Sequence, residues 1–319
     1  MKKMIMLSFH IYNVNSGVVY VSKKNDFVDA FTRNDTIIVT QSLNITKNIK
    51  VNSYPNKIKV YGLDKSIYID INVNKTMEIN NIDFIEFKNI TIIGRVIYKN
   101  IAYTNHENMN YCGKFDINNK GNKNFSENHF TNFSYITCTF DKGRENAMRF
   151  YNGTYTFENS TFSGVNGATD SYIKLSGTEK DSMVFNNCFF NGNYYLSSII
   201  GFGCMVIIDN CEFINNFNIK KGSAITVRDG YYYMTNSTFK NCHTEGEGGV
   251  VYSLNNFDMK IDNLSVYNTT SIKAGGCISV INNFPDRTGT ISNISIYGLG
   301  EKFPQKGPGS IVRYINKLV

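Results

Sequence analysis

The chain has 319 residues, of which 42% are hydrophobic, so it is long enough to bury a substantial core. Its formal net charge of +7 comes from dispersed lysines rather than from a run of like charges. This distribution favours a solvated outer surface, with affinity for acidic polysaccharide as the alternative. No segment resembles a nucleic-acid-binding module or a transmembrane span.

Residues 1–16 have the features of a short signal peptide. Lys2 and Lys3 precede the apolar run MIMLSF, and Val14 and Ser16 precede the expected cleavage point. The alternatives are a buried first strand or a misassigned start codon. The signal-peptide interpretation predicts an extracellular or cell-surface protein whose residues 17–319 form one domain.

A strand and a short helix are predicted next. GVVYVS at 17–22 reads as a strand, and Asp26 can cap a helix that runs to about Phe31. The helix carries Phe27, Ala30 and Phe31 on one side, so it would cover the open N-terminal end of the fold that follows. Apolar runs between residues 35 and 73 then predict two or three irregular turns.

From residue 85 to residue 298 one pattern recurs. If its first residue is position 1, then positions 1 and 3 are apolar, position 5 is Asn, and position 8 is a large apolar residue. Its first copy is Ile85/Phe87/Asn89/Ile92, and a weaker copy has Thr137 in place of Asn. The repeated asparagines are Asn89, Asn159, Asn187, Asn210, Asn236, Asn263 and Asn293. From Thr137 onward the copies lie 22 to 30 residues apart, which indicates one repeated supersecondary unit.

A second repeat lies between the copies of the first. Small or glycine-rich residues lead into short strands at KGSAITV (221–227), GGVVYS (248–253), GGCISV (275–280) and GSIVRY (309–314). A unit with two or three short strands cannot bury its apolar face alone, but stacked units pair about 4.8 Å apart and enclose a core. The prediction is an all-β, single-domain parallel β-solenoid of about ten turns, with asparagine at stacked bends.

Two segments depart from the repeat. Between residues 98 and 130 the sequence is polar, and we expect an insertion loop at about 99–130. The sequence stops five residues after the last strand signature, so we expect an uncapped C-terminal edge that could support self-association.

The repeats N-x-[S/T/C]-x-F, as in NSTF and DNCEF, alternate with G-[GS]-x-[IV]. They resemble right-handed parallel β-helix proteins of the pectin-lyase-like class, and especially the polymorphic outer-membrane-protein repeats of secreted adhesins. The resemblance covers about residues 17–314. It implies a right-handed parallel β-helix but no particular activity, because this class contains lyases, hydrolases, esterases and non-catalytic adhesins.

Residues for polysaccharide cleavage are not evident. The NTD, DD and GHG motifs of the hydrolases are absent from the sequence. The outward positions of the second repeat supply bases but no carboxylate cluster for calcium; they are Arg149, Lys174, Ile200, Thr226, Tyr252, Ser279 and Arg313. We therefore predict no catalytic residue, metal or cofactor. A non-catalytic, adhesin-like scaffold is favoured, and a polysaccharide-active enzyme with a divergent site is the alternative.

His243, Glu245 and Glu247 form the remaining chemical candidate. An imidazole and two carboxylates close together can hold a metal or transfer a proton. A fourth ligand is not evident, and an ordinary polar loop between turns is the alternative.

Three aromatic residues are the candidate binding residues. Tyr231, Tyr233 and Phe189 occupy outward positions of their strands. Exposed rings can stack on sugars or on a partner protein, although the absence of Trp weakens a dedicated carbohydrate platform. Partial burial of the tyrosines under loops is the alternative. The expected partner is a polysaccharide or a cell-surface protein.

Twelve Asn-x-Ser/Thr sequons occur, five of them at repeated asparagines that we expect to point inward or into the stacked bend. The acceptor candidates for glycosylation are Asn34, Asn44, Asn74, Asn124, Asn132 and Asn152. Among seven cysteines, Cys138, Cys188 and Cys211 share one repeat position. They are predicted to form a column of small side chains, with a Cys188–Cys211 disulfide as the alternative in an oxidising compartment.

Overall fold

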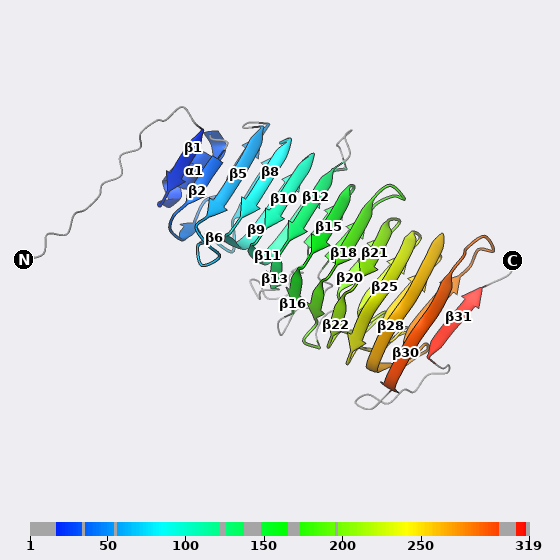
Figure 1. Ribbon diagram of the computed structural model, residues 1–319. Coiled ribbons are helices and arrows are strands. Elements are labelled where there is room, and N and C mark those ends of the chain that lie inside the picture. The colour runs from blue at the N-terminus through cyan, green and yellow to red at the C-terminus, as the bar shows by residue number, and fades with distance from the viewer. Residues whose placement is uncertain are drawn as a thin grey trace, which may run out of the picture.

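The computed structural model of the chain is an elongated parallel β-solenoid of about nine turns (Figure 1). The structure describes residues 17–33, 36–53, 56–120, 126–136, 148–164, 173–194, 197–299 and 311–316. Equivalent strands of successive turns pair in parallel, as β15 and β18 do. The fold class predicted from the repeats is therefore confirmed, and the right-handed sense of the coil stays a prediction.

Three parallel sheets run along the solenoid. Sheet 1 contains β1 (Val18–Val21), β2 (Thr36–Val39), β5 (Lys57–Gly62), β8 (Phe84–Lys88), β10 (Tyr103–Glu107), β12 (Glu127–Thr131), β15 (Thr154–Glu158), β18 (Ser182–Asn186), β21 (Met205–Asp209) and the first parts of β25 (Tyr231–Lys240), β28 (Asp258–Ser271) and β30 (Thr290–Leu299). Sheet 2 contains β3 (Leu43–Ile45), β6 (Tyr68–Ile71), the first parts of β9 (Thr91–Lys99) and β11 (Asn110–Asn118), then β13 (Ser134–Ile136), β16 (Thr161–Ser163), β19 (Phe189–Asn191), β22 (Glu212–Ile214) and the later parts of β25, β28 and β30. Sheet 3 contains β4 (Ile49–Asn52), β7 (Thr76–Asn80), the later parts of β9 and β11, then β14 (Met148–Tyr151), β17 (Ile173–Ser176), β20 (Ile199–Phe202), β24 (Ile225–Arg228), β27 (Val251–Leu254), β29 (Ile278–Asn282) and β31 (Val312–Asn316).

A short extra ladder forms between sheets 2 and 3 near the C-terminal end. It consists of β23 (Phe217–Asn218), β26 (His243–Thr244) and the end of β28. None of the described segments forms a helix that is long and apolar enough to cross a bilayer.

Helix α1 (Lys24–Arg33) packs against the first turn. Phe27, Ala30 and Phe31 are buried, and the Phe31 ring lies 6.5 Å from that of Phe87 in the core. The helix therefore packs its apolar side onto the N-terminal end of the core. It begins two residues before Asp26, so this aspartate lies in the first helical turn, where its charge favours the positive end of the helix dipole.

The large apolar residue that ends each repeat forms a ring stack in the core. The Phe162, Phe190 and Phe213 rings are fully buried, and successive centroids lie 4.5 Å apart. Phe239 continues the stack at 4.8 Å. These separations match the spacing of paired strands, so each ring stacks on its equivalent in the next turn.

Asparagine occupies the bend between sheets 1 and 2 in nine successive turns, with φ between 49° and 54°. These residues are Asn89, Asn108, Asn132, Asn159, Asn187, Asn210, Asn236, Asn263 and Asn293. Asparagine tolerates left-handed angles because its short side chain can hydrogen-bond locally. Neighbouring amides also bond between turns: Asn210 Nδ2 donates to Asn187 Oδ1 at 2.6 Å, and Asn263 Nδ2 donates to Asn236 Oδ1 at 2.7 Å.

These bend asparagines lie at the surface. Of the two expected orientations, the inward one is wrong, because most of them, such as Asn159 and Asn263, are exposed. The other, into the stacked bend, is confirmed, because amides such as those of Asn263 and Asn236 bond to each other along it. Asn132, and not Thr137, occupies the bend in its turn, and residue 137 lies outside the described residues.

The predicted insertion loop at about 99–130 is wrong for most of its length. β10 and β11 pair with strands of the preceding turn, and β12 pairs with β10, so the segment forms a regular turn. The repeat is present in the structure but hard to recognise in the sequence, because Thr104, His106 and Asn128 occupy inward positions that are apolar in other turns. Residues 121–125 lie outside the described residues.

Two of these inward polar residues bond to each other inside the core. Thr104 Oγ1 donates to Asn128 Oδ1 at 3.0 Å, and Asn128 Nδ2 donates to the Thr154 carbonyl at 3.0 Å. Burial of polar groups is tolerated when they are hydrogen-bonded in this way.

His106 differs from its polar neighbours. It is 2% exposed, and neither ring nitrogen has a hydrogen-bond partner among the described residues. Its ring lies between Phe87 and Phe130, at centroid distances of 5.8 and 4.8 Å. Burial lowers the pKa of His106 to about 3, so the imidazole is neutral in the folded protein near neutral pH.

We expect the substitution His106→Phe to make the protein more resistant to acid. The unfolded chain takes up a proton at this histidine near pH 6.5, whereas the folded chain does so only near pH 3. The free energy of unfolding therefore has its full value above pH 6.5 and decreases as the pH falls toward 3. At pH 4 the decrease is about 3 kcal/mol. Urea unfolding at pH 7 and pH 4 should show this loss in the wild type and a smaller loss in H106F. The partly exposed His129 provides the control: H129Q should keep the wild-type acid sensitivity, and an unchanged sensitivity of H106F would contradict the prediction.

Candidate functional site

Tyr231 and Tyr233 lie on the outer side of sheet 1, in β25. The Tyr231 ring stacks on Phe257 with centroids 5.5 Å apart. The Tyr233 hydroxyl donates to Asp258 Oδ2 at 3.1 Å. Burial, followed by this hydrogen bond, raises the pKa of Tyr233, so its hydroxyl acts as a donor rather than as a base. The structure thus brings together two of the three aromatic binding candidates.

Phe189 lies on a different surface. It follows the asparagine bend and belongs to β19 of sheet 2, where its register neighbours are Thr161 and Glu212. Tyr231 and Tyr233 precede the bend in their own turn and belong to sheet 1. A single ligand contact shared by all three rings is therefore not supported.

Two phenylalanines and an arginine that the strand repeats did not predict extend the tyrosine surface. Phe257 and Phe284 are 39% and 46% exposed. The Arg287 guanidinium carbon lies 3.7 Å from the Phe257 ring centroid and 5.3 Å from that of Phe284, within cation–π range. We call Tyr231, Tyr233, Phe257, Phe284 and Arg287 the aromatic surface. A sequence signal for it exists, because Asn-Asn-Phe occurs at 255–257 and again at 282–284.

A carboxylate borders the aromatic surface. Asp258 accepts hydrogen bonds from Thr288 Oγ1 at 2.7 Å and from the Tyr233 hydroxyl, and these bonds lower the pKa of Asp258. Exposed rings beside an ionised carboxylate and a guanidinium can stack on a sugar and hydrogen-bond to its hydroxyls. Because Asp258 stays ionised and Tyr233 stays protonated at neutral pH, this pair is not tuned for proton transfer.

A second polar region lies on the outer side of sheet 3. Arg149 and Lys174 are neighbours in register, as their spacing predicted. Asp116 precedes Arg149 in the same column, and its Oδ2 lies 3.7 Å from Lys114 Nζ and 4.0 Å from an Arg95 nitrogen. Burial raises the pKa of Asp116 against the opposing influence of these cations. This region thus contains a single carboxylate and four cationic side chains, those of Arg95, Lys114, Arg149 and Lys174. Such a composition favours ion pairing or anion binding over calcium coordination.

His243, Glu245 and Glu247 do not converge on a common point. His243 is buried, its Nδ1 is hydrogen-bonded with the Thr270 hydroxyl, and its ring stacks on Phe217. Glu245 is exposed, whereas Glu247 is partly buried in another set of contacts. Burial lowers the pKa of His243, which further favours a neutral, structural imidazole. The idea of a metal or proton-transfer triad is therefore not supported.

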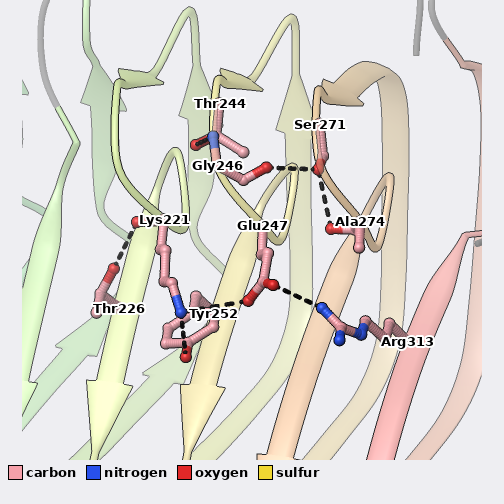
Figure 2. Close-up of polar contacts among 9 residues, drawn as sticks. All are labelled: Lys221, Thr226, Thr244, Gly246, Glu247, Tyr252, Ser271, Ala274 and Arg313. Atoms are coloured by element: carbon pink, nitrogen blue, oxygen red, sulfur yellow. Dashed lines mark hydrogen bonds and ion pairs between the residues drawn. The ribbon is translucent and has the colours of Figure 1, made fainter. Parts of the chain in front are cut away.

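Glu247 instead belongs to an ion-pair cluster that joins several turns (Figure 2). Its Oε1 accepts a hydrogen bond from Arg313 Nη1 at 2.6 Å, and its Oε2 lies 3.3 Å from Lys221 Nζ. Lys221 Nζ also donates to the Tyr252 hydroxyl at 2.7 Å and lies 4.2 Å from the centre of that ring. We call these four residues the Glu247 cluster.

The electrostatics of the Glu247 cluster indicate a structural role. Burial opposes the charge of Glu247, but Arg313 and Lys221 outweigh it and lower the pKa of this carboxyl. Burial also opposes protonation of Lys221, and its contacts with Tyr252 and Glu247 nevertheless raise the pKa. Ser279, which lies between Tyr252 and Arg313 in register, is small enough to let Arg313 reach Glu247. The cluster therefore fastens β31 to earlier turns.

The glycosylation candidates occupy different environments. Exposed candidates are Asn44, Asn74 and Asn132, the last within an asparagine bend. Asn152 is half-buried at a left-handed position. Asn34 and Asn124 lie outside the described residues.

The cysteine column is reduced and buried where it is described. Cys188 and Cys211 are free thiols in neighbouring turns, and the Cys188 backbone N–H donates to Cys211 Sγ at 3.4 Å. The alternative of a disulfide between them is therefore wrong, because both are free thiols. Cys138 lies outside the described residues, and Cys112 is disulfide-bonded.

We expect Glu247→Gln to loosen β31 by about 1–2 kcal/mol, because the bonds to Arg313 and Lys221 lose their charge assistance and are partly solvent-screened. Hydrogen exchange of the β31 amides should accelerate roughly tenfold. Since the pKa of Glu247 is lowered in the folded state, this stabilisation is present above its ordinary pKa of 4.5 and is lost as the pH falls through the folded value. The matched control is Glu245→Gln, which removes the same charge from an exposed position two residues away. Equal acceleration in both variants would argue against the ion-pair explanation.

No protein-family model matches this chain, and no curated protein matches it. The resemblance to pectin-lyase-like proteins thus rests on the repeats themselves, and the structure supports it at the level of a parallel β-solenoid.

Proposed function

We propose that the protein is a secreted or cell-surface right-handed β-helix scaffold, adhesin-like, that binds carbohydrate without catalysis. The observation that carries the proposal is the aromatic surface, where the exposed Phe257 and Phe284 rings flank Arg287 and Tyr231 stacks beside them. Rigid rings present a large contact area at a low entropic cost, which suits a weak polar ligand such as a sugar.

Polar groups around the rings favour a sugar over a protein partner. Asp258, Thr288 and Arg287 interrupt the apolar area, so it does not form the continuous core expected of a standard protein interface. The same groups supply both acceptors and donors at the ring edges. Sugars need this combination, because they present apolar C–H faces bordered by hydroxyls.

An extracellular or cell-surface location is supported by three features. Residues 1–16 have signal-peptide character, and exposed sequons occur at Asn44 and Asn74. The disulfide bond of Cys112 also fits an oxidising compartment.

A polysaccharide-active enzyme with a divergent site remains the second candidate, and Asp116 is the residue that favours it. A carboxyl whose pKa is raised by burial beside Lys114 and Arg95 has the properties of a general acid. Release of reducing or unsaturated ends from a polysaccharide, abolished by Asp116→Asn, would favour this candidate over the scaffold.

We expect Tyr231→Ala combined with Phe257→Ala to weaken polysaccharide binding at least tenfold, because loss of ring stacking removes about 1 kcal/mol or more for each ring. Affinity electrophoresis in gels that contain neutral or acidic polysaccharides provides the measurement. Tyr267 and Tyr297 form a matched control, since they are exposed and stack 4.7 Å apart on sheet 2. Their alanine variants should migrate like the wild type. Equal retardation of the wild type and the Tyr231/Phe257 variant would refute the role of the aromatic surface.

A further inference from the structure

We propose that the outer side of sheet 1 binds one extended, neutral polysaccharide chain along the solenoid axis, held at two separate aromatic sites. The first site is a pair formed by Phe84 and Tyr103, and the second is the aromatic surface around Tyr231. This inference rests on the proposed carbohydrate-binding function and adds the class of ligand and its direction on the protein.

The first aromatic pair resembles the second site in composition. The Phe84 and Tyr103 rings stack 5.3 Å apart with an interplanar angle of 5°, and both are partly exposed. His129 lies 5.4 Å from Tyr103, and Lys59 Nζ lies 5.8 Å from the Phe84 ring centroid. Flat rings with a cation beside them therefore occur at both places.

The two sites occupy the same column of the sheet. Register pairing places Phe84, Tyr103 and Tyr231 at one outward position, and the strands between them are β12, β15, β18 and β21 (Figure 1). Tyr103 and Tyr231 are five strand steps apart, which corresponds to roughly 24 Å at about 4.8 Å per step. A ligand that contacts both sites must therefore be long and must run across the strands.

Most side chains on the strip between the sites are uncharged. Of its three outward columns on β12, β15, β18 and β21, the two farther from the asparagine bend contain Glu127, His129, Thr154, Thr156, Ser182, Val184, Met205 and Ile207. These positions are all at least partly exposed. Short and apolar side chains leave room for the flat face of an extended polymer, and their hydroxyls can bond to it.

Charge between the two sites disfavours an acidic polymer. The outward positions of the four strands include the acidic residues Glu127, Glu158 and Asp209, and no Lys or Arg. Near the first pair, Glu86 is offset by Lys88 at 3.1 Å. A polyanion would thus meet like charge along the strip, although the whole chain carries a net charge of +7. The ligand class that fits is a neutral polysaccharide.

Two linked sites have a measurable consequence. When one ligand molecule occupies the first site, its binding to the second site is intramolecular. The overall affinity therefore exceeds the affinity of either site alone on the order of 10²-fold. Oligomers too short to span both sites bind at one of them only. Affinity should therefore increase in a step at the length that reaches from Tyr103 to Tyr231, rather than smoothly with each added sugar.

The test uses the full chain and isothermal titration calorimetry with β-1,4-linked glucose, mannose and xylose oligomers of increasing length. At least one series should show the step of about 10²-fold. Phe84→Ala combined with Tyr103→Ala should remove the step and keep the binding of short oligomers, and Tyr231→Ala should also remove the step. The Tyr267→Ala and Tyr297→Ala control on sheet 2 should keep the step, and circular dichroism of each variant checks that the solenoid is intact.

The outcomes separate this inference from the proposed function. If short oligomers bind through Tyr231 but longer ones bind no better, carbohydrate binding stands and the two-site inference is overturned. Tighter binding of polygalacturonate than of any neutral series would overturn the charge argument and with it this inference. If no saccharide binds, or if only a protein partner or a second copy of the chain binds to sheet 1, both proposals fail.

Discussion

The bend between sheets 1 and 2 is the constraint on which the rest of the structure depends. Each turn must change direction at the same place, because parallel strands stay in register only if successive turns have matching paths. The required φ near +50° is costly for most residues and accessible to asparagine. Amide bonds such as Asn210 to Asn187 then tie the bends of neighbouring turns to each other. One residue type thus supplies both the angle and a link between turns.

Register at the bend determines what lies inside and outside. The rings of Phe190 and Phe213 meet at 4.5 Å because both follow an asparagine bend at the same spacing. The same register aligns Tyr103 with Tyr231 on the outer side of sheet 1, five strand steps apart. A solenoid therefore presents its surface as columns, and any function of that surface depends on how residues are distributed along a column. Distance along the axis follows directly from the number of turns.

The sequence predicted the repeated turns well where inward positions are apolar and the bend holds asparagine. It failed at 99–130, because Thr104 and Asn128 are acceptable in the core through hydrogen bonds that join neighbouring turns. Alternation also identified Tyr231, Tyr233 and Phe189 as outward, but outward positions before and after a bend face different directions. Phe257 and Arg287 lie in connections, where strand alternation carries no information. Their contact depends on how two successive connections stack, which becomes visible only in three dimensions.

Several charged residues on the outer surface pair with an opposite charge in the next turn. Lys99 pairs with Glu78, Lys240 pairs with Glu212, and Lys221 pairs with Glu247, each with a partner in a neighbouring turn. Like charges stacked at the strand spacing would repel each other. A regular solenoid therefore favours opposite charges at neighbouring positions of successive turns. Carboxylates held in these pairs have lowered pKa values, as Glu247 and Glu78 do, and are poor proton donors at neutral pH. The regularity that stabilises the fold therefore works against acid–base chemistry on its surface, whereas exposed rings keep their binding capacity without any change of ionisation. Ion pairing between turns thus weakens acid–base groups but leaves the exposed rings unaffected, which favours binding on sheet 1 over catalysis on sheet 3.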